Sequence, residues 1–230
     1  LFFSMASKQT DKEEGVYDHT IPSKILSTAN IENVTDETYD KLDEIFLASQ
    51  QNNRDNSFLN CWYMGEKESL DMWHGFGKDG IVIFSDIPKI AYLINNLHKS
   101  LSYSVSFGEV EYNDELKQRE IHSPLYVKNS HFKDENEFRI VFDLSMYKAK
   151  YYVENDISVI TNVDSDVEPD PKYMQKKEPG FILKCELDSI ITEVRIHPKA
   201  TERELEDLVK KLREELNLCC PIGFSQLKIG

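Results

Sequence analysis

Apolar residues recur along the chain at two spacings, and each spacing predicts one kind of secondary structure. Steps of three and four residues, which are typical of one face of a helix, occur over residues 35–50, 88–101 and 201–217. A shorter helix is expected over residues 68–76. Thr35 is a suitable N-cap for the first helix, and Thr201 with Glu204 forms the sequence of a capping box for the last.

Strands are predicted where apolar residues alternate with polar ones or form short runs. These segments cover residues 1–4, 58–64, 81–84, 103–112, 138–142, 181–187, 193–197 and 225–229. The alternation slips by one residue at Gly108, which predicts a β-bulge there. Residues 50–57 are polar and rich in Asn, so a loop is expected after the first helix.

The order of these elements favours an α+β fold, because strands and helices mix without a strict βαβ rhythm. We expect one domain over residues 1–230, built on a mixed or antiparallel twisted sheet with flanking helices. Residues 144–180 are predicted to form an irregular acidic insertion, since residues 154–170 contain six acids and no base.

The net charge of −14 narrows the range of partners. An acidic chain repels phosphate backbones and anionic membrane surfaces, so a small molecule or a protein is favoured over nucleic acid or membrane. Much of the charge comes from residues 32–44 and 154–170, each of which holds six acids. The remaining surface is therefore closer to neutral than the total suggests, and the oligomeric state is left open.

Targeting and redox signals point to a cytoplasmic protein. No apolar run approaches the ~20 residues of a transmembrane helix, and residues 1–4 are too short for the apolar part of a signal peptide. The four cysteines, Cys61, Cys185, Cys219 and Cys220, show no CxxC spacing, which favours reduced thiols.

The sharpest candidate site is the segment Glu135-Asn136-Glu137-Phe138-Arg139. On a strand, the period of two would place Glu135, Glu137 and Arg139 on one face and the apolar residues on the other. Two carboxylates beside a guanidinium can hold a hydroxylated ligand or stabilise a developing positive charge. The alternative is a solvated strand face with an ion pair, worth about 0–1 kcal/mol.

Two further groups are candidates for ligand binding. Trp62 and Trp73 lie close together in the sequence with Glu68 and Ser69 between them, and tryptophan can stack on a nicotinamide or nucleobase ring. Core packing is the alternative for both tryptophans. Asp11 and Glu14 form a second group, which could bind a divalent metal or orient a base, or could belong to an ordinary polar loop.

Taken in order, these motifs resemble the bacterial and phage family called domain of unknown function 2971. The matching residues are Asn60-Cys61-Trp62, Glu68-Ser69, Met72-Trp73, Gly80-Ile81, Ser85, Lys128, Glu135, Glu137, Arg139, Asp188, Ile190-Ile191, Pro198, Ser225 and Leu227, with Asp11 and Glu14-Gly15 at the front. The chain departs from the family at Phe76, where members often carry Tyr, and at Asn129, where many carry Arg. By this resemblance we also expect the chain to lack the family's strand and helix that precede position 1.

The resemblance implies a cytosolic domain associated with mobile elements or defence genes. The Glu-x-Glu pair is also similar to the catalytic turn of ADP-ribosyltransferases, which use NAD. By that analogy Glu137 would hold the nicotinamide ribose and stabilise an oxocarbenium-like transition state, and Glu135 would activate the acceptor. Trp62 or Trp73 would stack on the nicotinamide.

Two other classes of function stay open at this point. A metal-dependent phosphodiesterase could use Asp11, Glu14, Glu68, Glu135 and Glu137 to hold Mg²⁺, with Lys128 meeting a phosphate. A non-catalytic interaction module, such as a defence sensor or antagonist, could use its acidic surface to attract a basic protein.

Overall fold

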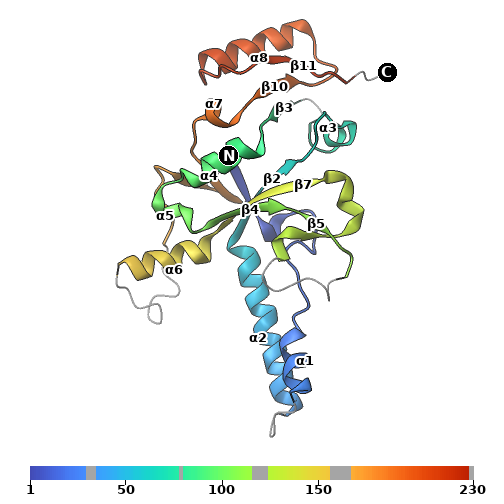
Figure 1. Ribbon diagram of the computed structural model, residues 1–230, viewed down its shortest axis with the longest axis vertical. Helices are drawn as coiled ribbons and strands as arrows, with labels where there is room; N and C mark the ends of the chain where they lie inside the picture. Colours follow the sequence, from blue (N-terminus) through green and yellow to red (C-terminus); the bar gives the residue numbers. More distant parts are fainter. Residues whose placement is uncertain (30–34, 78–79, 116–123, 156–166, 228–230) are drawn as a thin grey trace. The chain divides into compact units, whose positions relative to one another are not determined.

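The computed structural model describes residues 1–29, 35–77, 80–115, 124–155 and 167–227 (Figure 1). It has an α+β fold with an open sheet, which confirms the predicted class. Contacts divide the chain into two compact units: residues 1–62 with 103–183, and residues 63–102 with 184–230. The single domain expected over residues 1–230 therefore stays a prediction. No helix in the described ranges combines the length and the apolar character needed to cross a membrane.

The first unit is built on a six-stranded sheet in the order β4-β7-β2-β1-β9-β8. Its strands are β1 (Phe2–Met5), β2 (Ser57–Tyr63), β4 (Val105–Glu109), β7 (Glu137–Asp143), β8 (Met174–Lys177) and β9 (Gly180–Leu183). The pairs β4–β7, β1–β2, β1–β9 and β8–β9 are antiparallel. A separate parallel pair joins β5 (Glu111–Tyr112) to β6 (Val127–Lys128).

One face of this sheet carries an aromatic core. The rings of Phe58, Phe142 and Phe181 pack with centroids 4.8–6.0 Å apart, and all three side chains are at most 3% exposed. Tyr147 of α6 (Leu144–Glu154) packs on Phe142 from the same side. On β7, Phe138, Ile140 and Phe142 alternate along the strand, so they lie on this same face, and all three are buried. This confirms the strand and the apolar face predicted for it.

The opposite face is the one that carries polar chemistry. Leu59 and Val141 pack there with Ala6, and the short 3₁₀ helix η3 (Pro124–Tyr126) covers them through Leu125 and Tyr126. Two other 3₁₀ helices belong to this unit: η1 (Ala6–Lys8) follows β1, and η4 (Ser130–Glu135) lies between β6 and β7. By the period of two, Glu137 and Arg139 share the face of Val141.

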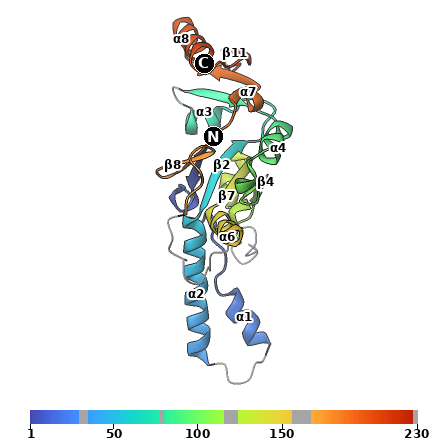
Figure 2. The ribbon, with the colours of Figure 1, turned by 90° about the vertical axis from the view of Figure 1, so that its left-hand side faces the viewer.

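Two helices, α1 (Ile21–Thr28) and α2 (Asp36–Asp55), lie side by side in the first unit (Figure 2). The side chain of Thr35 accepts a hydrogen bond from the Thr38 amide, which confirms it as an N-cap. The loop predicted for residues 50–57 is wrong, because α2 continues to Asp55. The Asn and Gln side chains in this stretch bond within the helix, as Asn56 does to Asn52, so their polarity alone does not end it.

The second unit contains a three-stranded sheet in the order β11-β10-β3. Its elements are α3 (Leu70–Phe76), β3 (Ile81–Phe84), α4 (Ile87–Asn95), α5 (Lys99–Ser102), α7 (Leu187–Ile190), β10 (Glu193–Ile196), α8 (Glu202–Glu214) and β11 (Ile222–Phe224). Strand β10 is antiparallel to β3 and parallel to β11. The capping box of α8 is confirmed, with both Thr201 and Glu204 making their reciprocal bonds.

Three local predictions are wrong. Pairing between β4 and β7 runs without interruption through Gly108, so no bulge lies there. The next residue after β4, Val110, still donates its amide to the Glu137 carbonyl and is buried on the face of Glu137, opposite to that of Phe107. Residues 144–180 are not irregular throughout, since they contain α6, β8 and the start of β9, although residues 156–166 lie outside the described part. The predicted last strand at 225–229 is displaced to β11, and residues 228–229 are not described.

Candidate functional site

The site is assembled around Arg139, whose side chain is completely buried in the first unit. Its guanidinium meets Glu14 in a bidentate pair, with Nη1 to Oε1 at 2.5 Å and Nη2 to Oε2 at 2.9 Å. Gly15, at φ +70°, turns the chain directly after Glu14 in a region that L side chains rarely adopt. Glu14 and Arg139, far apart in the sequence, therefore form one buried ion pair. The loop that carries Glu14 is part of the interior of this unit and not an ordinary polar loop at the surface.

Arg139 also contacts a second glutamate on its own strand and the backbone of η3. Its Nε donates to Glu137 Oε2 at 2.6 Å, and Nη1 donates to the carbonyl of Leu125 at 2.6 Å. Glu137 is 6% exposed and Arg139 is 0% exposed, so the face of β7 that they share is buried. The reading of this face as a solvated strand surface is therefore wrong, because η3 and the Glu14 loop cover it.

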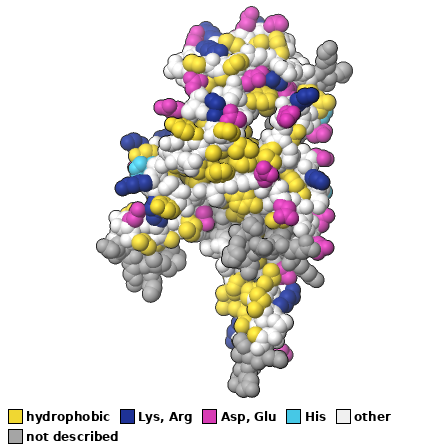
Figure 3. Space-filling view, in the orientation of Figure 1, with side chains coloured by type: hydrophobic (Ala, Val, Ile, Leu, Met, Phe, Trp, Pro, Cys, Tyr) yellow, Lys and Arg dark blue, Asp and Glu magenta, His cyan; other side chains and the backbone are white. Residues whose placement is uncertain are grey.

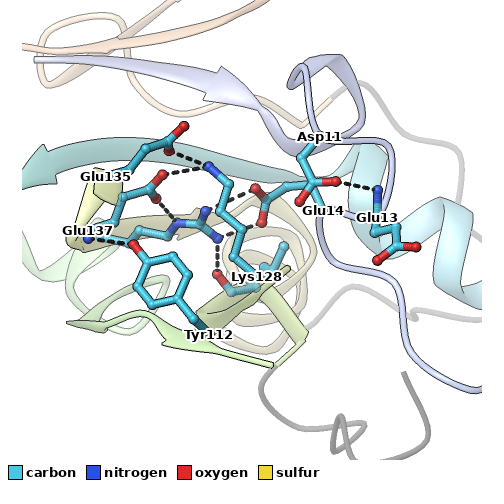
Figure 4. A network of polar contacts seen from close by, with 9 residues as sticks. Asp11, Glu13, Glu14, Tyr112, Lys128, Glu135 and Glu137 are labelled. Carbon is cyan, nitrogen blue, oxygen red and sulfur yellow. Dashed lines mark hydrogen bonds and ion pairs between the residues drawn. The ribbon is translucent and has the colours of Figure 1, made fainter. Parts of the chain in front are cut away.

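Lys128 of β6 joins the two glutamates (Figure 4). Its Nζ lies 2.7 Å from Glu137 Oε1 and 2.6 Å from Glu135 Oε2. The expectation that Glu135 continues the strand face is wrong, since Glu135 ends η4 and Asn136 adopts a left-handed φ of 38° before β7 begins. The turn and the lysine, rather than strand periodicity, bring Glu135 next to Glu137.

The two glutamates differ in how easily they lose a proton. Burial, together with a hydrogen bond to Glu137, raises the pKa of Glu135 to about 7, although Lys128 acts in the opposite direction. Burial also opposes ionisation of Glu137, but the hydrogen bond from Glu135 and the charges of Arg139 and Lys128 outweigh it and lower the pKa of Glu137 to about 2. The pair therefore combines a fixed anion with a carboxyl group that can exchange a proton near neutral pH.

Asp11 lies beside Glu14 and is 7% exposed. Its Oδ1 accepts a hydrogen bond from the Glu13 amide at 2.9 Å, while its buried Oδ2 has no partner in the described part of the chain. The Asp11 bond closes a turn that carries Glu14 toward Arg139. This geometry gives Asp11 a role in shaping the loop.

Trp62 does not lie with this cluster. On β2 it is four residues from Phe58, so the two side chains share the aromatic face, whereas Leu59 marks the polar face. Its Nε1 donates to Asn60 Oδ1 at 2.6 Å. The indole therefore points to the side of the sheet opposite Glu137.

The second unit holds the other three residues predicted for a site. Trp73 is 4% exposed, packs edge-on against His197 and donates from Nε1 to Glu68 Oε2 at 3.1 Å. Ser69 is the N-cap of α3, because its side chain accepts from the Met72 amide. These contacts account for Trp73 and Ser69 as structural residues, so core packing describes Trp73 better than stacking on a ligand.

Glu68 is the centre of a second polar cluster. Arg195 Nη1 donates to its Oε1 at 2.5 Å, and the Gln226 amide and the Ser225 hydroxyl also donate to the same carboxylate. Burial raises the pKa of Glu68, but these hydrogen bonds lower it overall. Glu68 thus fastens the segment before α3 to β10 and to the chain after β11.

Three contributors to the first cluster carry no signal in the sequence. The hydroxyl of Tyr112 accepts from the Glu137 amide at 2.8 Å, Leu125 contributes only its carbonyl, and the Phe132 ring lies 4.4 Å from Lys128 Nζ. Each comes from a short element whose position depends on tertiary packing. Tyr112 lies in a segment predicted as a strand, but tyrosines are too common in strands for this to mark a site residue.

The described residues offer no group of three or more His, Cys, Asp or Glu side chains placed to hold a metal ion. Glu68 belongs to the second unit, and Glu14, Glu135 and Glu137 are each bonded to a basic side chain. The metal-dependent phosphodiesterase alternative therefore draws no support from this arrangement.

Comparison of the chain with protein-family models, with curated proteins and with solved structures finds no match. The resemblance to domain of unknown function 2971 stays a prediction carried by the motifs described above. Inferences about function rest on the chemistry of the site.

Proposed function

We propose that this protein is an ADP-ribosyltransferase-like enzyme that uses NAD as donor and works through Glu135 and Glu137. The observation that carries the proposal is the pairing of two carboxyl groups by one lysine, with the pKa of Glu135 raised to about 7 and that of Glu137 lowered to about 2. Paired carboxyl groups whose pKa values are pushed apart are the arrangement that acid–base chemistry at a glycosidic carbon requires.

In the proposed reaction each glutamate has one task. Glu137 remains an anion and stabilises the positive charge that develops on the ribose as its bond to the nicotinamide nitrogen breaks. Glu135 accepts the proton of the acceptor group that forms the new bond to the ribose carbon. The nicotinamide nitrogen keeps the electron pair of the broken bond and leaves as the neutral base.

The charge of the site supports a donor with a cationic end. Four carboxyl groups, from Asp11, Glu14, Glu135 and Glu137, face two basic side chains, those of Lys128 and Arg139. Such an excess of acid favours a positively charged ring and a cationic transition state. Trp62 faces the other side of the sheet, and the aromatic side chains that lie beside this cluster are those of Tyr112 and Phe132.

Incubation with NAD labelled in the ADP-ribose part tests this proposal. The wild-type protein should release nicotinamide and transfer or hydrolyse the label, and Glu137→Gln should lower the rate about 100-fold or more. Glu111→Gln, on an exposed strand position next to Tyr112, serves as the matched control and should retain the wild-type rate. No NAD binding and no nicotinamide release by the folded wild-type protein would remove the proposal.

A second candidate is an interaction module, favoured by the exposed surface of α2. Ile45 is 63% exposed and Leu47 is 49% exposed, and the helix begins with the acidic residues Asp36 and Glu37. Figure 3 shows hydrophobic side chains on the surface in the region of α1 and α2. A basic protein with an apolar centre would suit this surface. If it is the function, Ile45→Ser would abolish biological activity while Glu137→Gln would leave it intact.

Location and biological setting complete the proposal. We propose a cytoplasmic enzyme that acts in conflict between bacteria and phages or other mobile elements, a setting supported only by the resemblance to domain of unknown function 2971. Expression in a bacterial host challenged with phage checks this setting, since protection or toxicity should disappear in Glu137→Gln and persist in Glu111→Gln.

A further inference from the structure

Lys128 is enclosed by two carboxylates and an aromatic ring in the described part of the chain. Its Nζ is bonded to Glu135 and Glu137, its side chain is 8% exposed, and the ring of Phe132 lies 4.4 Å away. An ammonium group has three donors, and two of them serve the carboxylates. A phosphate at this ammonium group would lie against the two carboxylates in an acidic site, which argues against the phosphate contact expected for Lys128.

We infer that Lys128 is a positioning residue that holds Glu135 against Glu137 and assigns the two glutamates their different tasks. The inference rests on the proposed function, because those tasks belong to the proposed reaction. Its basis is geometric: Lys128 is the basic side chain that contacts both carboxylates, at nearly equal distances of 2.6 and 2.7 Å.

The two glutamates depend on Lys128 to different degrees. Glu137 keeps a second cationic partner in Arg139 Nε at 2.6 Å, whereas the cationic partner of Glu135 among the described residues is Lys128. Without the lysine charge, two carboxylates held close together repel each other, so one of them takes up a proton. Glu135 is that residue, since Arg139 continues to favour ionised Glu137.

Other charged and titratable groups around the pair are arranged on several elements. Arg139 lies on β7, Glu14 on the loop after η1, Tyr112 on β5 and Cys61 on β2, and each influences the charge of Glu137 or is influenced by it. None of these groups forms an ion pair with Glu135 in the described residues. Loss of Lys128 should therefore act mainly on Glu135.

The test measures NAD turnover against pH in Lys128→Gln, Lys128→Arg and the control Lys133→Gln. Lys133 is an exposed lysine of η4, two residues before Glu135. In the wild type, kcat should rise with pH through an apparent midpoint near 7 as Glu135 loses its proton. Lys128→Gln should move this midpoint up by one pH unit or more, lower kcat at neutral pH about tenfold and change KM by less than threefold.

The matched variants separate positioning from binding. Lys128→Arg should restore most of the wild-type pH profile, and Lys133→Gln should leave it unchanged. A large rise in KM with an unchanged pH profile in Lys128→Gln would show that Lys128 binds the donor, which would overturn the inference.

A titration that needs no turnover separates this inference from the proposed function. Carboxyl-carbon NMR should show the Glu135 midpoint rising in Lys128→Gln, with Glu135→Gln used for assignment. In the wild type itself, the Lys128 Nζ signal should shift with the same midpoint as the Glu135 carboxyl signal, so the test survives if Lys128→Gln fails to fold. Independent midpoints for these two groups would overturn the inference, whereas absent NAD turnover with a shared midpoint would overturn only the proposed enzyme.

Discussion

The two units each bury a glutamate against an arginine, yet the two clusters differ in how completely the carboxylate is satisfied. Glu68 accepts from Arg195, Trp73, Ser225 and the Gln226 amide, and its pKa is lowered. In the first unit the chain of ion pairs from Glu14 ends at Glu135, whose side chain is 23% exposed and whose pKa is raised to about 7. A saturated carboxylate fastens segments together, whereas one held by a single shared cation can exchange a proton.

This difference assigns the predicted site residues to separate roles. Glu14, Glu135, Glu137, Arg139 and Lys128 form one continuous network of ion pairs. Glu68, Ser69 and Trp73 instead make contacts that hold segments of the second unit together. Variants that remove one partner at a time from each cluster test whether the distinction holds.

The largest effect is expected from Arg139→Met. It leaves Glu14 and Glu137 buried without their guanidinium, and breaking such a pair costs about 3–5 kcal/mol in the free energy of unfolding. Arg195→Met should cost less, about 1–3 kcal/mol, because Glu68 retains three uncharged donors. Urea denaturation of both variants measures the difference.

Arg203→Met on the exposed face of α8 is the control for these two arginine variants, and it should change stability by at most about 0.5 kcal/mol. Equal losses in Arg139→Met and Arg195→Met would contradict the proposed distinction, because they would mean that both clusters are equally structural.

The second largest effect separates activity from stability. Glu137→Gln should reduce NAD turnover about 100-fold or more because it removes the anion that faces the developing charge. Glu68→Gln should leave turnover near the wild-type value while lowering stability by about 1–3 kcal/mol, since one oxygen of a saturated carboxylate becomes a donor. Parallel rate and urea measurements on the folded variants check both statements, and a turnover defect in Glu68→Gln alone would reverse the assignment.

The third prediction concerns pH. The pKa of Glu135 in the folded protein lies above its ordinary value of 4.5, so its contribution to stability is fully present below pH 4.5 and is lost as the pH rises through about 7. The lowered pKa of Glu68 has the opposite sign: its contribution is present above about pH 4.5 and is lost on acidification. Urea denaturation at a series of pH values from 4 to 8 measures this effect. The free energy of unfolding of the wild type should fall toward neutral pH, and this fall should be smaller in Glu135→Gln.

The quantity to compare at each pH is the difference in the free energy of unfolding between wild type and Glu135→Gln, because the contributions of all groups that the two proteins share cancel in it. A constant difference from pH 4 to 8 would show that Glu135 titrates normally and would remove the support that the pair gives to acid–base chemistry.

The smallest effects are expected at the tryptophans. Trp73→Phe loses the bond to Glu68 and should cost about 1 kcal/mol without altering the KM for NAD. Trp62→Phe should also leave KM unchanged, since Trp62 faces away from Glu137. Thermal unfolding and steady-state kinetics provide the measurements. A KM for NAD raised more than fivefold in either variant would show that the tryptophan replaced there contributes to NAD binding.

Much of the secondary structure follows from local sequence. The alternation from Phe138 to Phe142, the apolar run of β3, the Thr35 cap and the capping box at Thr201 are all present in the structure, because they depend on neighbouring residues and on short-range bonds. Residues 144–154 were missed as a helix because α6 packs only Tyr147 and Tyr152 into the core and shows little helical periodicity.

The candidate site shows the limit of such local reasoning. The sequence by itself determined which residue types were available: Glu135, Glu137 and Arg139 in one segment, and Glu14 in another. Only tertiary structure decided that Glu14 pairs with Arg139 across 125 positions, that Lys128 joins two glutamates, and that Trp62 and Glu137 lie on opposite faces of the sheet. Burial and the partner of each charge set its pKa, and both arise only when distant segments pack together.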